Sequence, residues 1–155
     1  MNAVDGLWTV GFWSQDNAFH LPVRVYYEDT DAGGIVYHSI YLNYAERART
    51  EFVRALGIHQ QSILDQRGLA FAVRRCTADF RRPARLDDML IVRTRLVELR
   101  GASLDFEQTI LRGDEVLVDY AVQIACITTQ GRAVRFPADL RDSLLKGMAV
   151  MATAS

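Results

Sequence analysis

Residues 22–54 read PVRVYYEDTDAGGIVYHSIYLNYAERARTEFVR, and this stretch decides the fold. Its first six residues are rich in β-branched and aromatic side chains, which predicts a strand over residues 22–27. Turn-forming residues follow at positions 28–34. Apolar or small side chains then recur at helical spacing, at Tyr41, Tyr44, Ala45, Ala48, Phe52, Ala55 and Leu56. This spacing predicts one long amphipathic helix, with Ser39 as its N-cap and Gly57 as its stop.

The rest of the chain alternates mainly between apolar and polar residues. A short helix is predicted over residues 60–67. Four alternating runs predict strands over residues 70–81, 88–99, 103–112 and 115–128. The breaks between these strands are short enough for hairpins, so we expect antiparallel neighbours. A short strand near 133–136 and a terminal helix near 138–145 complete the pattern.

One long helix and a run of antiparallel strands predict an α+β fold. The apolar face of the helix needs a cover, and a sheet of about five strands can curl around it because strand twist accumulates. A single curled sheet leaves an unpaired edge, so we expect a homodimer with a continuous sheet, or a homotetramer made of two such dimers.

Composition and charge limit the class of protein. The 155 residues are 50% hydrophobic and 24% charged, which suits one globular domain over 1–155, with an N-terminal arm (1–20) and a tail (146–155). A net charge of -1 gives no global attraction to nucleic acid. No run resembles a membrane span or a signal peptide, so we expect a cytoplasmic protein. Cys76 and Cys126 lie in apolar runs, which predicts buried, reduced thiols.

The candidate catalytic residues lie between the predicted first strand and the predicted long helix. Glu28, Asp29 and Asp31 are close together there, and the residues alone do not choose between the two aspartates. A carboxylate can act as a nucleophile or activate a water, while amides at a helix N-terminus can stabilise an oxyanion. Gly33 and Gly34 allow a close backbone approach to a ligand. An acidic, solvated turn is the alternative interpretation.

Other functional signatures are absent from the sequence. It contains no GxSxG nucleophile elbow, no GxGxxG dinucleotide-binding motif and no P-loop. Three scattered histidines predict no metal site, and no cofactor is expected. The densest basic cluster is a candidate phosphate-binding site, although a charged sheet edge is an alternative explanation: Arg74, Arg75, Arg81, Arg82 and Arg85.

Residues 22–54 closely resemble the signature of the 4-hydroxybenzoyl-CoA thioesterase family, and most closely that of its YbgC branch, the Tol–Pal-associated acyl-CoA thioesterases. The similarity continues through RRPARLDDML (81–90) and RGASLDF (100–106) to about residue 140. It implies a hotdog fold and a homo-oligomer with active sites near subunit interfaces. The arm before Leu21 is longer than we expect for that branch.

The resemblance also implies the roles of individual residues. It selects Asp31 over Asp29 as the catalytic carboxylate, and it adds Tyr27 and His38 to the catalytic set, with the backbone amide of His38 as oxyanion donor. The expected substrate-binding residues are Gly34, Ile35, Val36, Tyr37, Arg74, Arg82, Arg85 and Ser103.

We therefore expect an enzyme that hydrolyses acyl-CoA to free acid and CoA, with Asp31 as nucleophile or general base. Acyl carrier protein is a second candidate partner, and a position peripheral to the inner membrane would fit the Tol–Pal association. The alternative is a non-catalytic module of the cell-envelope machinery that binds acyl-CoA or acyl carrier protein. A hotdog dehydratase is a third and weaker alternative. The acyl chain length cannot be inferred from the sequence.

Overall fold

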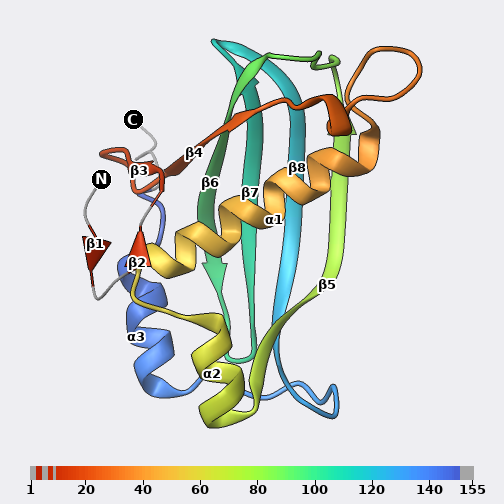
Figure 1. Cartoon of the computed structure of the whole chain (residues 1–155). Coiled ribbons are helices and arrows are strands. Elements are labelled where there is room, and N and C mark those ends of the chain that lie inside the picture. Colours follow the sequence, from red (N-terminus) through yellow and green to blue (C-terminus); the bar gives the residue numbers. More distant parts are fainter. Residues whose placement is uncertain (1–2, 5–6, 9, 151–155) are drawn as a thin grey trace.

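The computed structural model describes residues 3–4, 7–8 and 10–150, and one antiparallel sheet dominates them (Figure 1). Its strand order is β3-β4-β6-β7-β8-β5. The bounds are β3 Phe12–Trp13, β4 Phe19–Arg24, β5 Leu69–Phe80, β6 Met89–Leu99, β7 Ser103–Arg112 and β8 Glu115–Thr128. A separate two-stranded sheet pairs β1 (Ala3–Val4) with β2 (Leu7–Trp8).

The long helix α1 (His38–Ala55) crosses one face of the sheet (Figure 1). Its predicted apolar face is confirmed, because five of the seven residues are buried and the other two partly so. Ser39 is not the N-cap as we expected: Tyr37 takes that position, and no side chain caps the helix. Gly57 follows the C-cap with φ 85°, a left-handed conformation that suits glycine at a helix end.

Strand alternation matches burial against this helix. On β6, Leu90, Val92, Thr94 and Leu96 are fully buried, and β7 and β8 repeat this pattern. The curled sheet around one helix is the hotdog arrangement that the sequence predicted, although the short β3 makes six strands rather than five. Two smaller helices, α2 (Gln60–Arg67) and α3 (Ala138–Lys146), lie at the end where α1 finishes (Figure 1).

The strand order differs from the expected chain of hairpins. We expected β5 and β6 to pair through the short break after Phe80, but both edges of β6 are occupied, by β4 and by β7. β5 pairs with β8 instead. Residues 81–88, the crossing segment, therefore pass over three strand spacings of about 4.8 Å each at one end of the sheet. This segment becomes a wall of the site described below.

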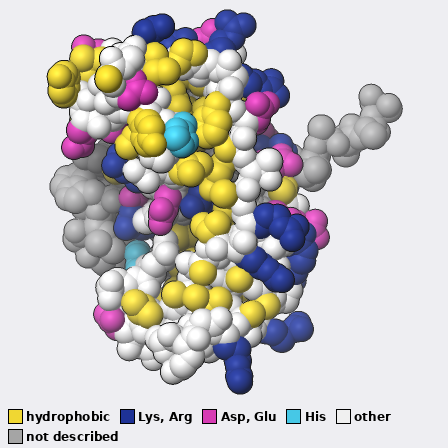
Figure 2. Space-filling model, turned by 90° about the vertical axis from the view of Figure 1, so that its right-hand side faces the viewer, with side chains coloured by type: hydrophobic (Ala, Val, Ile, Leu, Met, Phe, Trp, Pro, Cys, Tyr) yellow, Lys and Arg dark blue, Asp and Glu magenta, His cyan; other side chains and the backbone are white. Residues whose placement is uncertain are grey.

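β5 is an edge strand whose helix-facing side chains are covered by α1 only in part. Val73 and Phe80 stand opposite buried residues of β8, yet they are 51% and 46% exposed. Cys76 lies on the same side and is exposed, so the expected burial of both thiols holds only for Cys126. Figure 2, which views this side of the molecule, shows a band of hydrophobic side chains along the face.

Three other boundaries differ from the sequence expectations. The first long strand ends at Arg24 and not at residue 27, because Tyr27–Asp29 form a single 3-10 turn, η1. β3 and the start of β4 lie within the expected arm, whose polar turn at residues 14–17 hid the hairpin. The expected strand at 133–136 is reduced to one bridge, Ile127 to Ala133.

The described residues extend the fold at both expected ends. Ala149 donates a backbone hydrogen bond to Leu96, so the sheet continues past the predicted start of the tail. None of the helices in the described part of the chain has the length and hydropathy needed to cross a bilayer.

Candidate active site

The residues between the 3-10 turn and α1 form a closed loop, residues 28–36, which we call the acid loop. Thr30 and Val36 face each other in an antiparallel bridge that closes it. Inside the loop, the N–H of Asp31 donates to the carbonyl of Ile35 at 2.9 Å, and the N–H of Gly34 donates to the carbonyl of Asp31 at 3.0 Å. Gly34 has φ 79°, so this turn needs a residue that tolerates the left-handed region.

The two aspartates of the loop have different surroundings. Asp29 is 6% exposed, and its Oδ2 accepts hydrogen bonds from the Tyr44 hydroxyl at 2.6 Å and from the Tyr26 N–H at 2.9 Å. Asp31 is exposed, and its Oδ1 accepts one hydrogen bond, from the N–H of Gly33 at 2.8 Å. Only Asp31 therefore has a carboxylate oxygen open to a ligand.

Asp31 lies between two hollows. On one side, a groove of about 360 Å³ has an apolar lining that includes Ile35, Val36, Tyr41 and Phe80. On the other side, a hollow of about 550 Å³ is lined by Tyr27, Thr30, Asp31, Ala32, Gly34 and Leu86. A bound molecule can thus contact the carboxylate from the groove that runs along α1 or from the outer side of the acid loop.

The N-terminus of α1 opens on the same groove. His38 is the first helical residue and lines the groove. Within the described residues, the amides of His38 and Ser39 donate to no other group, as is usual for the first turn of a helix. The His38 ring is exposed, and it lies 4.4 Å from the Tyr37 ring and 6.2 Å from the Phe80 ring, centroid to centroid. A residue with a free amide, His38, and an exposed carboxylate, Asp31, therefore line one groove.

The crossing segment forms the opposite wall of the groove and is bonded to the acid loop. The N–H of Val36 donates to the carbonyl of Ala84 at 2.9 Å, and Ile35 forms a bridge with Arg85. The N–H of Ala84 donates to the hydroxyl of Tyr41 on α1, also at 2.9 Å. Burial raises the pKa of Tyr41 and keeps its phenol neutral.

The predicted arginines have different placements. Arg82 lines the groove, and its guanidinium is 2.9 Å from Glu115. Arg85 is exposed beside the acid loop. Arg74 lies at the bulge of β5, near the middle of that strand, and is not brought to the acid loop of its own chain. Arg82 at the groove and Arg85 beside the acid loop therefore remain candidates for binding phosphate, whereas Arg74 does not lie with them.

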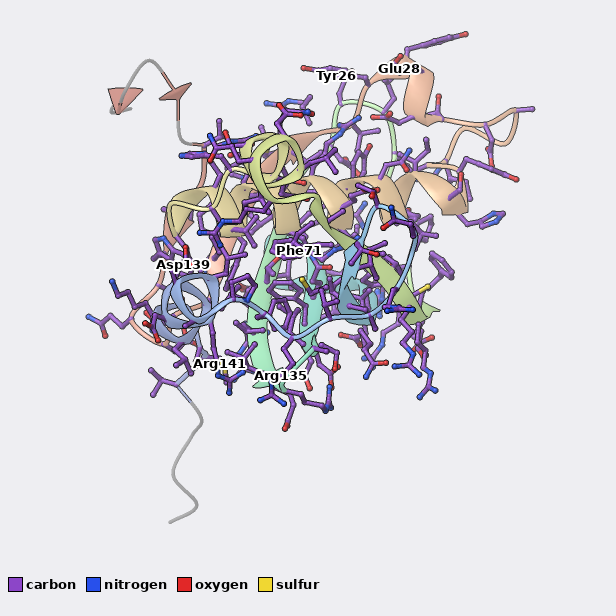
Figure 3. The ribbon with its side chains drawn as sticks, turned by 90° about the horizontal axis from the view of Figure 1, so that it is seen from below. Tyr26, Glu28, Phe71, Arg135, Asp139 and Arg141 are labelled. Carbon is purple, nitrogen blue, oxygen red and sulfur yellow. The ribbon has the colours of Figure 1, made fainter. Side chains whose placement is uncertain are left out.

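Ser103 is also separated from Asp31 within the chain. It starts β7, next to the turn of the β6–β7 hairpin and opposite Ala125 of β8, whereas the acid loop lies beyond the other end of β7. Arg141 donates to the carbonyl of Arg100 at this turn, at 2.7 Å. Figure 3 shows Arg135 and Arg141 on the side of the molecule away from Tyr26 and Glu28.

Three residues of the site were missed in the sequence or assigned only to the core. Tyr41 and Tyr44 were placed on the apolar face of the helix, and their hydroxyls turn out to hold the two walls of the groove. Phe80, at the end of β5, lines the groove beside His38. A buried tyrosine usually finds a hydrogen-bond partner, and this was the available signal, but helical spacing does not name that partner.

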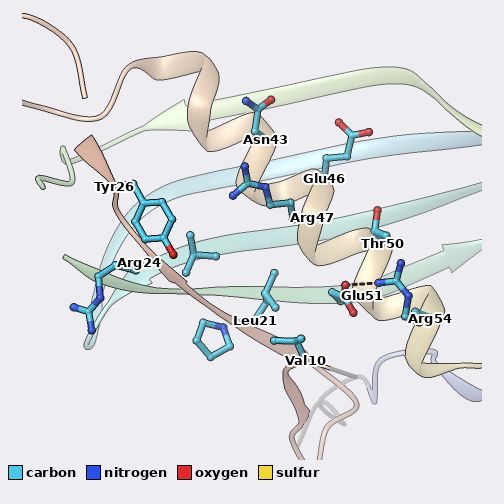
Figure 4. A pocket seen from close by; sticks show the side chains of 12 residues that line it. Val10, Leu21, Arg24, Tyr26, Asn43, Glu46, Arg47, Thr50, Glu51 and Arg54 are labelled. Atoms are coloured by element: carbon cyan, nitrogen blue, oxygen red, sulfur yellow. Dashed lines mark hydrogen bonds and ion pairs between the residues drawn. The ribbon is translucent and has the colours of Figure 1, made fainter. Parts of the chain in front are cut away.

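A further large hollow lies elsewhere in the described part of the molecule. It has a volume of about 570 Å³ and runs between β4 and the outer face of α1 (Figure 4). Charged residues of the middle and end of the helix line it, including the ion pair of Glu51 with Arg54. This position is away from the helix N-terminus, so the hollow offers no free amide to a carbonyl oxygen. We therefore place the candidate site at Asp31.

Comparisons with known proteins identify the family and agree with this fold. The sequence model of the thioesterase-like superfamily matches residues 25–144. The chain is similar to an acyl-CoA thioesterase YbgC of Haemophilus influenzae, with 46% identity over 81% of this chain and 93% of that protein. It is also similar to an acyl-CoA thioester hydrolase YbgC of Escherichia coli O6:H1, with 48% identity over 70% and 81% of the two chains.

Solved structures of similar proteins share this fold. A probable thioesterase from Bartonella henselae is 40% identical and superimposes with a TM-score of 0.73 over 76% of this chain and 98% of that one. A 4-hydroxybenzoyl CoA thioesterase crystallised with 4-hydroxybenzoyl CoA superimposes with a TM-score of 0.76 over 82% and 98% of the two chains. Its identity is 20%, so this likeness concerns the fold.

Proposed function

The chain belongs to the thioesterase-like superfamily and is an acyl-CoA thioester hydrolase, in which we propose that Asp31 is the catalytic carboxylate. The observation that carries the proposal is that the exposed Asp31 carboxylate and the residue with a free amide at the start of α1, His38, line one groove.

The proposed reaction uses both groups at once. The thioester carbonyl oxygen accepts hydrogen bonds from the amides of His38 and Ser39, which stabilise the negative charge that develops on it. Asp31 either takes a proton from a water that attacks the carbonyl carbon, or attacks that carbon itself and forms an anhydride that water then cleaves. In both routes the carbon–sulfur bond breaks, and the CoA thiolate leaves and takes up a proton.

The test of Asp31 is the release of CoA thiol from acyl-CoA. Asp31→Asn removes the charge and keeps the size, and we expect kcat to fall by about 10²–10⁴-fold, the range that a positioned base contributes. Asp114→Asn is the matched control, because Asp114 is an exposed aspartate in the β7–β8 turn. Equal rates in Asp31→Asn and the wild type would remove Asp31 from its role.

We also propose that Arg82 and Arg85 bind the phosphates of CoA, because both lie on the crossing segment beside the acid loop and a guanidinium matches phosphate geometry. The contact of Arg82 with Glu115 would have to open or be shared. Gly34, Ile35, Val36 and Tyr37 would contact the thioester end of the substrate, and Tyr27 would contact it from the outer hollow.

A homo-oligomer is part of the proposal. Among the described strands, β5 has an unpaired edge, and its apolar side is partly uncovered; a second β5 would complete both in an antiparallel dimer. In such a dimer Arg74 and Ser103 would reach an active site only from the neighbouring copy. Pairing of two dimers would give a tetramer.

The partner and location follow from the same chemistry and from the resemblance to the YbgC branch. Acyl carrier protein presents its thioester on the same phosphopantetheine arm as CoA, so we include it as a second substrate carrier. A cytoplasmic enzyme that works with the Tol–Pal machinery at the inner membrane is the corresponding proposal. A non-catalytic binding module would instead bind acyl-CoA tightly without releasing thiol.

A further inference from the structure

We infer that the hydrogen bond between Tyr44 and Asp29 holds the acid loop in its catalytic position, so that Tyr44 and Asp29 are positioning residues for Asp31. This inference rests on the proposed function of Asp31. It assigns a purpose to a buried carboxylate and a buried phenol that the proposed reaction does not itself use.

Asp29 joins three separate parts of the site. Its Oδ2 accepts from the Tyr44 hydroxyl, in the interior of α1, and from the N–H of Tyr26, just after β4. Its backbone carbonyl accepts from the N–H of Tyr37, the N-cap of α1, at 3.0 Å. One residue therefore links the end of β4, the body of the helix and the start of the helix.

These bonds fix both ends of the acid loop. Asp31 follows Asp29 by two positions, and the loop returns through Val36 to Tyr37, which is bonded back to Asp29. His38, whose amide is the proposed oxyanion donor, is the next residue. A shift of Asp29 would therefore change the distance between the Asp31 carboxylate and that amide. Such a shift alters the geometry of the reaction even if the fold survives.

The hydrogen bond between Tyr44 and Asp29 is suited to holding the acid loop because both residues are buried and the donor and acceptor are distinct. Tyr44 is fully buried and Asp29 almost so. The Tyr44 hydroxyl donates this bond, and Asp29 Oδ2 accepts it. Burial raises the pKa of Tyr44, and the hydrogen bond to Asp29 raises it further, so Tyr44 keeps its proton throughout the working range of the enzyme.

The first test removes the Tyr44 hydroxyl alone. In Tyr44→Phe we expect kcat for acyl-CoA to fall by about 10–10²-fold, since a displacement near 1 Å costs that much. KM should be unchanged, because the groove and the arginines are kept. Tyr120→Phe is the matched control: it removes another buried tyrosine hydroxyl, on β8, and should lower the melting temperature without lowering kcat. Wild-type kcat in a folded Tyr44→Phe would overturn the inference.

The second test uses neutral isosteres at both aspartates. Both side-chain bonds of Asp29 reach the same oxygen, which the amide oxygen of asparagine can replace. We therefore expect Asp29→Asn to keep most of kcat, Asp29→Ala to lose it as Tyr44→Phe does, and Asp31→Asn to be inactive. A fully active Asp29→Ala beside an inactive Asp31→Asn would overturn the positioning role and leave the proposed function standing. An active Asp31→Asn would instead contradict the proposed function.

Discussion

At the scale of single residues, different hydrogen bonds give the two aspartates of the acid loop different roles. Asp29 has two donors on one buried oxygen, and Asp31 has one donor and an open face. Burial of a carboxylate is tolerated only where such donors replace water. The sequence shows two acids two positions apart and cannot rank them, because the donors that separate them come from Tyr44, fifteen residues away.

The amide of His38 is testable apart from its ring. His38→Ala keeps the N–H and removes the imidazole, and we expect most of kcat to remain. His38→Pro removes the N–H at the first helical position, where proline is tolerated. Tyr37, at φ -65° and ψ 137°, already has the conformation that proline requires of the preceding residue. We expect kcat to fall by about 10²–10³-fold, as for the loss of one oxyanion donor.

Circular dichroism should show that α1 is intact in both variants of His38. Equal kcat in His38→Ala and His38→Pro would contradict the role of the amide and point to the ring or to neither group.

Gly34 gives a second prediction at this scale. Gly34 and Gly57 have φ 79° and 85°, and a Cβ added at either would meet nothing within 4 Å. Alanine at each should therefore cost a similar strain of about 1–2 kcal/mol, visible as equal losses in the free energy of unfolding. Only Gly34 borders Asp31, so only Gly34→Ala should lower kcat/KM. Loss of activity in Gly57→Ala would show that backbone strain alone explains the loss of activity in both glycine variants.

At the scale of elements, the crossing segment depends on Arg112 of β7. Arg112 donates to the carboxylate of Asp88 at 2.8 Å and to the carbonyl of Pro83 at 3.2 Å, and it pairs with Glu115. The N–H of Arg85 donates to the same oxygen of Asp88. Partial burial raises the pKa of Asp88, but these bonds outweigh it and leave the pKa below its ordinary 3.8.

This arrangement predicts an acid dependence of stability. A carboxyl whose pKa is lowered in the folded state stabilises it above pH 3.8, and this contribution is lost as the pH falls through the folded-state pKa. We expect Asp88→Asn to make the free energy of unfolding less dependent on pH below 3.8. Urea unfolding at a series of pH values measures this.

Asp87→Asn is the control for Asp88, because Asp87 is exposed, and asparagine tolerates its φ of 71°. The same pH profile in Asp88→Asn and the wild type would contradict the prediction.

Elements with a strong period were predictable, and those fixed by distant partners were not. The spacing in α1 and the alternation in β6, β7 and β8 each reflect one buried face, which is a local property of the sequence. The first long strand was predicted too late in the chain, because residues 25–27 have strand-like side chains but turn away through η1. The bonds of Asp29 to Tyr26 and Tyr44 cause that turn.

At the scale of the whole molecule, strand order was the feature that the sequence did not reveal. A short break after Phe80 favours a hairpin, yet β4 already occupies the free edge of β6. The spacing of residues in the sequence describes neighbours along the chain. The position of β5 in the sheet depends instead on which strand edges the other strands leave unpaired. The groove wall formed by the crossing segment is a product of that order, so it could not be predicted either.

Because the edge of β5 is the proposed dimer interface, a substitution on this strand tests the oligomer. Val73 is 51% exposed on the helix-facing side of this strand, and Val73→Asp would place a charge in the proposed dimer interface. We expect light scattering to show a shift towards the mass of a single chain, with a parallel loss of thioesterase activity. Leu145→Asp is the control, because Leu145 is 49% exposed on α3, away from the edge. A multimer that survives Val73→Asp would contradict pairing through β5.

The strand order also bears on how the protein reaches its fold during synthesis. β5 leaves the ribosome well before β8, its only partner in the sheet of the described chain. At about 5–20 residues per second, an apolar strand thus waits for seconds with neither of its edges paired. The nascent chain is therefore most exposed to aggregation in this interval, and chaperone binding should concentrate there.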